Sequence, residues 1–510
     1  MSELPPLGPL PRHATRSGRF LLLALMAGLL FLRQAFAHRN LGEIPLLWGG
    51  EPWKALGFLY VSEVTLVLLL PIALIEGLRL WRLQRSNTPI TAEPLQAHLG
   101  WPVYLALAFV AWGVLHALYA FVATQPRDMY LIARQSAMAG YALIFVYGVI
   151  FFQRERRFID TAVSLAVMTA LITASVDFLA ARAADPAAPE STPRWAAFFN
   201  EKPWGQETLP IAILAAGLLA VYSGNWAWRI IPLAVLAFVG WRQGIRFQSV
   251  VPIALAGALA GYLVIALLTA MKGHEYTLQR AAFVLILFAI GGALYLQVRP
   301  TRKEDVKEVS AWSPGVYLEL LNRYETAEPP AGVPVFSTRS GGIVGDPEVI
   351  RLNTVYETAK NDSVRNNIWR FLVWRRMAID WSQKRPVLGA GVGRPWFYDA
   401  LYHTQFHYGE DRLGLDPHNS FLNLLYRYGL IGFLLLFAIV IAALNTALRA
   451  LRRAPTGDVL LEGLLLYFFS TVVFSSFTVA LEGAPYALPF WFSLALVYAR
   501  ARQILHALEV

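Results

Sequence analysis

The segment Asp416-Pro417-His418-Asn419 joins a polar stretch to an apolar helix and places a titratable ring at the junction. Aspartate is a good N-cap residue and proline is favoured at the first helical position, so the helix is expected to begin at Pro417. His418 would then lie in the first turn, where free backbone N–H groups carry partial positive charge. This position predicts a lowered histidine pKa, a neutral ring that accepts a proton, and a helix end that attracts anions. A histidine that only caps the helix is the alternative.

Arginines are expected on the same side of the membrane as His418. Arg365 lies in the loop before the helix, and Arg242 and Arg246 lie in a short turn between two apolar segments. Arginine binds phosphate through two parallel hydrogen bonds and keeps its charge in any environment. Several arginines with one neutral base suit acyl, phosphoryl or glycosyl transfer from a lipid-linked pyrophosphate. The alternative for Arg242 and Arg246 is that they only snorkel to lipid headgroups.

The elements that must position these residues are hydrophobic helices. The chain has 510 residues, 56% of them hydrophobic, and no cysteine, which excludes disulfides and thiolate chemistry. The apolar residues fall in about twelve blocks of roughly 16–25 residues, the length that crosses a bilayer. The blocks cover residues 20–36, 55–78, 101–123, 130–152, 159–181, 208–223, 226–240, 249–271, 281–298, 419–448, 459–480 and 484–503. We therefore expect an all-α polytopic membrane protein with about 12 transmembrane helices.

Basic residues collect in the loops on one side of this layout, at 12–19, 79–85, 154–157, 271–280, 449–453 and 500–502. The positive-inside rule places that side, and both termini, in the cytoplasm. The formal charge of +10 then reflects these loops rather than nucleic-acid binding. Residues 1–298 would hold spans 1–9, residues 299–418 one large periplasmic loop, and residues 419–510 spans 10–12.

The large loop is expected to contain short amphipathic helices. Residues 348–384 have a helical pattern and combine tryptophan with arginine, which suits the membrane–water interface. The segment Pro386–Gly393 follows and carries glycines at 389, 391 and 393. A phosphate-binding loop is one interpretation, but no strand precedes the segment. A tight turn that returns the chain toward the membrane is favoured.

A metal site is the other chemistry that the sequence offers. His403 and His407 have the i, i+4 spacing of helical zinc ligands, but the glutamate of a His-Glu-x-x-His motif is missing. Contact with sugar through the surrounding aromatic residues is favoured, so neither a metal nor a cofactor is predicted. The titratable residues within or near the spans are interpreted as interfacial or structural; they are His116, Asp177, Glu63, Glu76, Glu462 and Glu482.

Two motifs resemble a known family. His418-Asn419, followed by nine residues and then Gly429-Leu-Ile-Gly432, resembles the histidine signature of bacterial O-antigen ligases. The segment Pro386-x-x-Gly-x-Gly resembles the glycine segment that precedes this histidine in the wider O-antigen ligase and polymerase superfamily.

Two arginine segments extend the resemblance. Arg365-Asn-Asn-Ile-Trp369 resembles the Arg-x-x-x-Trp segment of the superfamily. Gly240-Trp241-Arg242 stands where the family often has Gly-Ser-Arg, although Trp241 replaces the serine, so Arg246 is an alternative equivalent. The specific match covers about residues 365–435.

The resemblance implies a metal-independent, inverting glycosyltransferase of the bacterial inner membrane. Such an enzyme would move a glycan from undecaprenyl pyrophosphate to a hydroxyl of lipid A–core at the periplasmic face, without a cofactor. His418 would act as the base, and Arg365 with Arg242 would hold the pyrophosphate. The remaining residues predicted to bind substrate are Arg246, Asn419, Arg376 and Arg394.

Other functions stay open at this point. An O-antigen polymerase would use another lipid-linked repeat unit as acceptor, and a protein O-oligosaccharyltransferase would use serine or threonine. One dominant outer loop favours the ligase, because polymerases tend to have two sizeable loops. A transporter of lipid-linked glycans would need polar residues in mid-span and internal repeats.

Overall fold

The structure is a computed structural model that describes part of the chain. The described residues are 44–45, 50–51, 63–64, 99–123, 129–152, 159, 162–163, 175–176, 179–180, 182–183, 192–193, 195–196, 250–271, 278–282, 285, 370, 374–375, 377–383, 385–393, 418–455, 457–477, 481–482 and 484–509. Within these residues the regular elements are helices, and no strand is present.

The long helices are α4 (Trp101–Ala123), α5 (Met129–Gly140), α6 (Leu143–Phe152), α11 (Val250–Ala270), α18 (Ser420–Arg453), α19 (Val459–Phe477) and α20 (Ala484–Glu509). Among the described residues, α4, α18 and α19 are long and apolar enough to cross a membrane. The prediction of a helical protein with apolar helices of membrane length is therefore confirmed for this part of the chain. The count of twelve spans and the extent of the large loop stay predictions.

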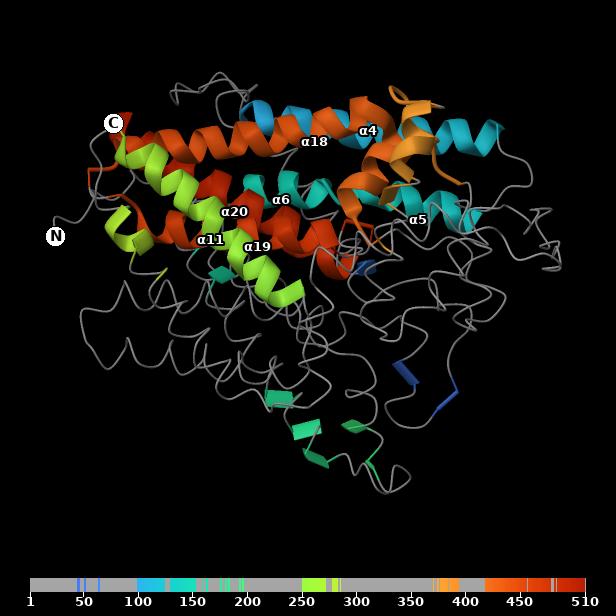
Figure 1. The fold of residues 1–510 in the computed structure, drawn as a ribbon, viewed down its shortest axis with the longest axis horizontal. Coiled ribbons are helices and arrows are strands. Elements are labelled where there is room, and N and C mark those ends of the chain that lie inside the picture. Colours follow the sequence, from blue (N-terminus) through green and yellow to red (C-terminus); the bar gives the residue numbers. More distant parts are fainter. Residues whose placement is uncertain are drawn as a thin grey trace, which may run out of the picture.

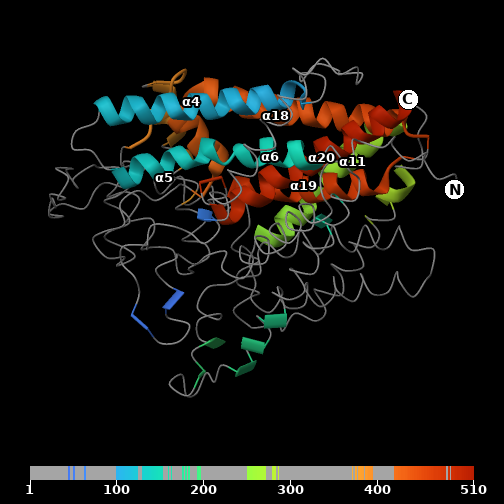
Figure 2. The ribbon, with the colours of Figure 1, turned by 180° about the vertical axis from the view of Figure 1, so that it is seen from behind.

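The helices form a layered bundle. α18 packs against α4 and α20, α20 also packs against α6 and α19, and α19 packs against α11. Figure 1 shows α4 and α18 along one edge of the bundle, with α6 and α20 next to them, and Figure 2 shows the same arrangement from behind. The core lies around α20, where Phe490, Trp491 and Tyr498 are almost fully buried.

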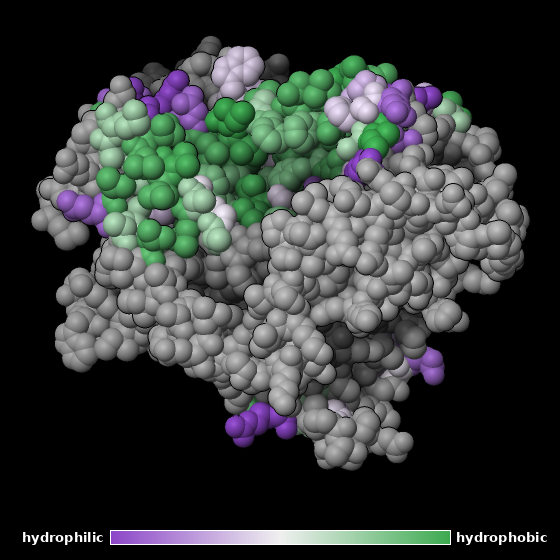
Figure 3. Space-filling view, in the orientation of Figure 1, coloured by the Kyte–Doolittle hydropathy of each residue, from purple (hydrophilic) through white to green (hydrophobic). Residues whose placement is uncertain are grey.

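The outward faces of α4 and α18 are apolar. Val114 and Leu118 on α4 are 52% and 57% exposed, and Leu434 and Ile441 on α18 are 55% and 60% exposed. Figure 3 shows hydrophobic side chains gathered over this part of the surface. A contiguous apolar surface of this kind is unfavourable in water and suits contact with lipid.

Three hydrogen bonds mark one end of the bundle: Tyr498 Oη donates to the Leu99 carbonyl (3.1 Å), Gln503 Nε2 to the Phe152 carbonyl (2.7 Å) and Arg452 Nη2 to the Leu268 carbonyl (3.0 Å). The start of α4 therefore lies with the ends of α6, α11, α18 and α20. We call this the basic end, because it holds Arg452, Arg453, Arg500 and Arg502. The start of α18 lies at the other end of the bundle, which we call the histidine end.

α18 is bent at Gly429, whose φ of 66° and ψ of −170° are not helical. Glycine is favoured there because a Cβ atom disfavours the left-handed region. A straight helix of 34 residues would be about 51 Å long, well beyond the roughly 30 Å of a bilayer core. The span predicted over 419–448 is confirmed by the length and hydropathy of α18. The structure adds a bend at Gly429, where the local backbone is not helical.

The segment Arg385–Gly393 docks on this bend. The amides of Ala390 and Gly391 donate to the carbonyls of Tyr426 (2.7 Å) and Arg427 (2.9 Å), and the amides of Leu430 and Ile431 donate to the carbonyls of Pro386 (2.9 Å) and Val387 (3.3 Å). Trp112 Nε1 donates to the carbonyl of Tyr428 at 3.1 Å. Backbone groups that a bend frees inside a membrane need such partners. The predicted tight turn is confirmed. The amides of Ala390 and Gly391 bond to α18 and that of Gly389 bonds to the Arg385 carbonyl, so they are not exposed for a phosphate.

Gly389→Ala tests this docking. A Cβ atom on Gly389 would collide with the Arg427 carbonyl and the Gly429 amide, and φ is +79°. We expect a loss of about 2–5 kcal/mol, from roughly 1–2 for the left-handed backbone and about 1–3 for the collision. Thermal unfolding in detergent measures it.

The matched control is Gly391→Ala. Gly391 has a φ of +87°, but its Cβ would meet nothing within 4 Å, so only the backbone cost of about 1–2 kcal/mol is expected. Equal losses in the two variants would contradict the docked arrangement.

The predicted fourth span, residues 130–152, is two helices instead of one. A turn at Tyr141 and Ala142 separates α5 from α6. Glu63 lies beside this turn and accepts hydrogen bonds from Arg134 Nη1 at 2.8 Å and from Tyr141 Oη at 2.6 Å. The pattern of apolar residues did not reveal the break, because both helices are apolar.

Glu462 forms a buried ion pair near the basic end. Its carboxylate accepts hydrogen bonds from Arg280 Nε (2.8 Å) and Nη2 (2.5 Å) and from Tyr262 Oη (2.7 Å). The structural role predicted for Glu462 is confirmed, because these bonds join α11, the segment 278–282 and α19.

Arg280→Met tests the ion pair and is expected to destabilise the protein by about 3–5 kcal/mol, because it leaves a buried carboxylate without its cation. The control is Arg453→Met, which breaks an exposed pair with Glu509 at 3.5 Å and should cost at most about 1 kcal/mol. Thermal unfolding of both variants measures the two losses of stability. A similar loss of stability in both would argue against the buried pair.

Candidate active site

His418 lies just before α18 rather than inside its first turn. Asn419 is the N-cap, and its side chain accepts a hydrogen bond from the Leu422 amide at 3.0 Å. His418 itself has a φ of 52°, in the left-handed region. The predicted helix start at Pro417 is therefore wrong, because the asparagine side chain takes the capping position. Asp416 and Pro417 lie outside the described residues.

The ring of His418 is neutral at pH 7, as predicted, but for another reason. Burial lowers the pKa of His418 to about 4, and the positive charge of Arg370 adds to this lowering. Both effects disfavour the imidazolium form.

Among the described residues, Arg370 is close enough to His418 for its charge to lower the pKa of the ring. Its Nη1 donates a long hydrogen bond of 3.5 Å to the carbonyl of Phe477, at the end of α19. One helical turn further on, Trp374 packs against the ring of Phe477, with centroids 6.1 Å apart. Burial lowers the pKa of Arg370, but a guanidinium group stays charged at neutral pH.

The sequence prediction missed Arg370, although a signal was present. Arg370-Phe-Leu-Val-Trp374 has the same Arg-x-x-x-Trp spacing as the pair Arg365 and Trp369 that was chosen. The two segments follow one another directly in the chain, so spacing alone could not decide between them. The other arginines predicted for the site lie outside the described residues, and their roles stay predictions; they are Arg365, Arg242, Arg246, Arg376 and Arg394.

A buried carboxylate lies at the start of α18. Glu482 is 2% exposed. It accepts a hydrogen bond from the Ser420 hydroxyl at Oε2 and one from Asn423 Nδ2 at Oε1, the latter at 3.0 Å. The Leu481 amide donates to Ser420 Oγ at 2.9 Å. We call Glu482, Ser420 and Asn423 the carboxylate anchor. The sequence analysis interpreted Glu482 as interfacial or structural, and the structure joins it to Ser420, two residues after His418.

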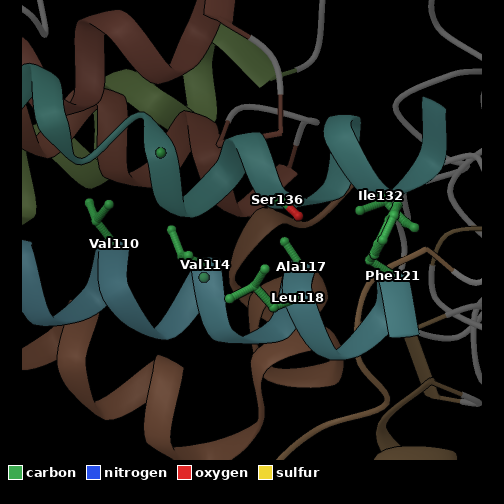
Figure 4. Close-up of a pocket in the computed structure, with 9 residues that line it drawn as sticks. Val110, Val114, Ala117, Leu118, Phe121, Ile132 and Ser136 are labelled. Atoms are coloured by element: carbon green, nitrogen blue, oxygen red, sulfur yellow. The ribbon is translucent and has the colours of Figure 1, made fainter. Parts of the chain in front are cut away.

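An apolar groove of about 290 Å³ runs between α4 and α5. Figure 4 shows side chains of α4, among them Val114 and Leu118, pointing toward α5, with the oxygen of Ser136 on the opposite wall. Gly393 connects the groove to the docked glycine segment: its amide donates to Gln135 Oε1 at 2.7 Å, and its Cβ position adjoins Ile132.

Known families and curated proteins were compared with the chain, and none matches it. The resemblance to O-antigen ligases therefore rests on the motifs. The structure adds one relation between these motifs: the glycine segment hydrogen-bonds directly to the bend at Gly429. Gly432, the last position of the histidine motif, lies where a Cβ would press on Tyr428 and on Trp112.

In the part of the chain that the structure describes, no group of three or more His, Cys, Asp or Glu side chains is placed to hold a metal ion. His403 and His407 lie outside that part. Metal independence stays a prediction. What the described residues offer is a neutral base and a fixed cation, an arrangement that can accept a proton and stabilise an anion.

Proposed function

We propose that this protein is a membrane glycosyltransferase of the O-antigen ligase kind. It transfers a glycan from undecaprenyl pyrophosphate to a hydroxyl group of lipid A–core. One observation carries the proposal: His418, whose lowered pKa keeps its ring neutral, precedes a membrane-length helix and is within electrostatic range of the charged Arg370. A neutral imidazole can take a proton from an attacking hydroxyl, and a guanidinium can hold the departing pyrophosphate.

The proposed reaction is a single displacement. His418 removes the proton of the acceptor hydroxyl as the oxygen attacks the anomeric carbon. The bond from that carbon to the pyrophosphate oxygen breaks, and its electron pair leaves with the phosphate, whose charge Arg370 stabilises. One attack from the face opposite the leaving group inverts the anomeric centre, and no carboxylate pair of the glycosidase kind is needed.

Donor binding strengthens the base in this mechanism. A ring with a pKa of about 4 is neutral but weakly basic. The negative pyrophosphate favours the imidazolium form and offsets the charge of Arg370, so the pKa rises when donor is bound. Proton removal is then most favourable in the complex in which transfer occurs.

The orientation in the membrane is proposed from the positive-inside rule. By this rule the basic end faces the cytoplasm, and the histidine end then faces the periplasmic side of the inner membrane. The apolar groove between α4 and α5 opens beside lipid-facing residues such as Leu118, which is 57% exposed. Its apolar lining suits a short stretch of the prenyl chain of the donor.

Reconstitution in liposomes tests the proposal. The purified protein is given undecaprenyl-pyrophosphate-linked oligosaccharide together with lipid A–core, and the expected product is glycan on the core. A chelator such as EDTA should leave the rate unchanged, and loss of activity restored by a divalent ion would argue against the metal-free mechanism. Longer glycans that stay on the lipid carrier would identify a polymerase, and glycan on serine or threonine peptides a protein O-oligosaccharyltransferase.

A transporter is the second candidate, and the break between α5 and α6 favours it. Broken helices with charged residues near them often line transport paths, and Glu63, Arg134 and Tyr141 meet at this break. The same liposomes separate the two functions. Movement of the lipid-linked glycan across the bilayer, with no new glycosidic bond, would identify a transporter.

A further inference from the structure

We propose that Glu482 is the positioning residue for His418, an inference that rests on the proposed glycosyl transfer. Glu482 contacts Ser420 and Asn423 of α18. It acts through the carboxylate anchor, which holds the first turn of α18 against the connection between α19 and α20. The backbone of His418, two residues before Ser420, is held in place as a result.

Both oxygens of Glu482 are engaged by α18. Oε2 accepts from the Ser420 hydroxyl and Oε1 accepts from Asn423 Nδ2. Ser420 Oγ accepts in turn from the Leu481 amide, so the chain next to Glu482 is tied to the same hydroxyl. All three side chains of the anchor are at most 2% exposed. Each carboxylate oxygen of Glu482 therefore faces a donor of α18.

The conformation of His418 explains why such an anchor is needed. A φ of 52° is uncommon for a residue other than glycine. Strained backbone of this kind persists only where the surrounding structure determines it, and it often occurs at functional sites. Asn419 caps the helix through Leu422, and the anchor fixes the residue that follows the cap. Together they define where the chain leaves the helix and where the ring points.

The anchor also relates His418 to Arg370. Arg370 donates to the carbonyl of Phe477, the last residue of α19. Glu482 belongs to the connection that follows α19 and holds the start of α18. The proposed base, His418, and the proposed cation, Arg370, are therefore both positioned by contacts near the connection between α19 and α20. Without Glu482, the start of α18 can shift relative to Phe477, and the distance between the two groups changes.

The test compares Glu482→Ala with Glu482→Gln. Alanine removes both acceptors, and a misplacement of about 1 Å can cost around 10²-fold in rate. We expect a loss of that order in kcat, with the donor KM little changed. Glutamine keeps the shape: its oxygen accepts from Asn423, and its amide donates to Ser420 Oγ. It should restore kcat to within about threefold of wild type, because the hydrogen-bonded frame is kept.

Two further variants complete the set. Ser420→Ala should reproduce part of the loss, and the double variant with Glu482→Ala should be no worse than Glu482→Ala alone, since both act through one contact. Glu509→Ala, an exposed glutamate at the basic end, is the control and should behave as wild type. If Glu482→Ala does not fold, Glu482→Gln and Ser420→Ala still test the positioning role of Glu482.

Hydrogen exchange gives a readout that does not depend on transfer. Peptides covering residues 418–426 should exchange faster in Glu482→Ala than in wild type and in Glu482→Gln. Wild-type kcat and unchanged exchange in Glu482→Ala would overturn the proposal. So would a Gln variant as inactive as Ala with normal exchange, because the charge itself would then matter. If wild-type protein transfers no glycan but exchange responds as expected, the proposed function fails while the anchor is supported.

Discussion

His418→Ala is expected to lower the rate of glycan transfer by about 10²–10⁴-fold, the usual contribution of a general base. The variant should still insert in membranes and bind donor, because the cap at Asn419 and the carboxylate anchor use other side chains. Turnover by purified protein in liposomes, with donor binding measured separately, checks both parts. The control is His506→Ala, an exposed histidine in the last turn of α20 at the basic end. Transfer at the wild-type rate by His418→Ala would remove histidine from the mechanism.

The same residue predicts an unusual pH profile. Base catalysis requires the neutral ring, which is lost as the pH falls through the pKa of His418, about 4 in the free protein. kcat/KM should therefore hold well below pH 6.5 before it declines. Because the anionic donor raises the pKa, the acid limb of kcat should lie at higher pH than that of kcat/KM. Coincident limbs near pH 6.5 would show that the ring is not in the environment described above.

Arg370→Ala is expected to cost about 10²–10³-fold in transfer, the effect of removing one group that stabilises developing charge. Arg370→Lys should recover only part of the loss, because a point charge does not reproduce the paired hydrogen bonds of guanidinium to phosphate. Arg375→Ala is the matched control, since Arg375 is exposed in the same segment. Steady-state kinetics of the three variants provide the measurement.

The pH profile of kcat/KM distinguishes Arg370 from Arg365, the arginine assigned from the sequence. The charge of Arg370 lowers the pKa of His418, so its removal should raise that pKa and shift the acid limb of kcat/KM to higher pH. Arg365→Ala should leave the limb in place. If Arg365→Ala lowers transfer strongly and moves the limb of its residual activity while Arg370→Ala does neither, the assignment made from sequence is the correct one.

Local patterns identified several parts of this protein correctly. Runs of apolar residues predicted α4 and α19 almost to the residue, because a helix that faces lipid needs little beyond length and hydrophobicity. The glycine spacing around Gly389 predicted a turn, because a positive φ and the absence of a side chain are local properties. The histidine motif pointed to the start of α18 because the change from capping residues to an apolar run is also a local property.

Other features depended on contacts between distant segments. Whether Asp416 or Asn419 caps α18 is decided by which side chain reaches a free amide, and the bend at Gly429 is stable because Arg385–Gly393 satisfies the amides and carbonyls it frees. No local pattern encodes such partners.

The sequence by itself thus determined an all-α protein with apolar helices of membrane length, a glycine turn and a histidine near the start of an apolar helix. Only the tertiary structure decided that, among the described residues, the charge of Arg370 acts on that histidine and that Glu482 holds Ser420. Hydrophobicity and backbone preference act within a few residues and can be read along the chain. Charge pairing and side-chain hydrogen bonds act between residues that only folding brings together, here 48 (418 − 370) and 62 positions apart.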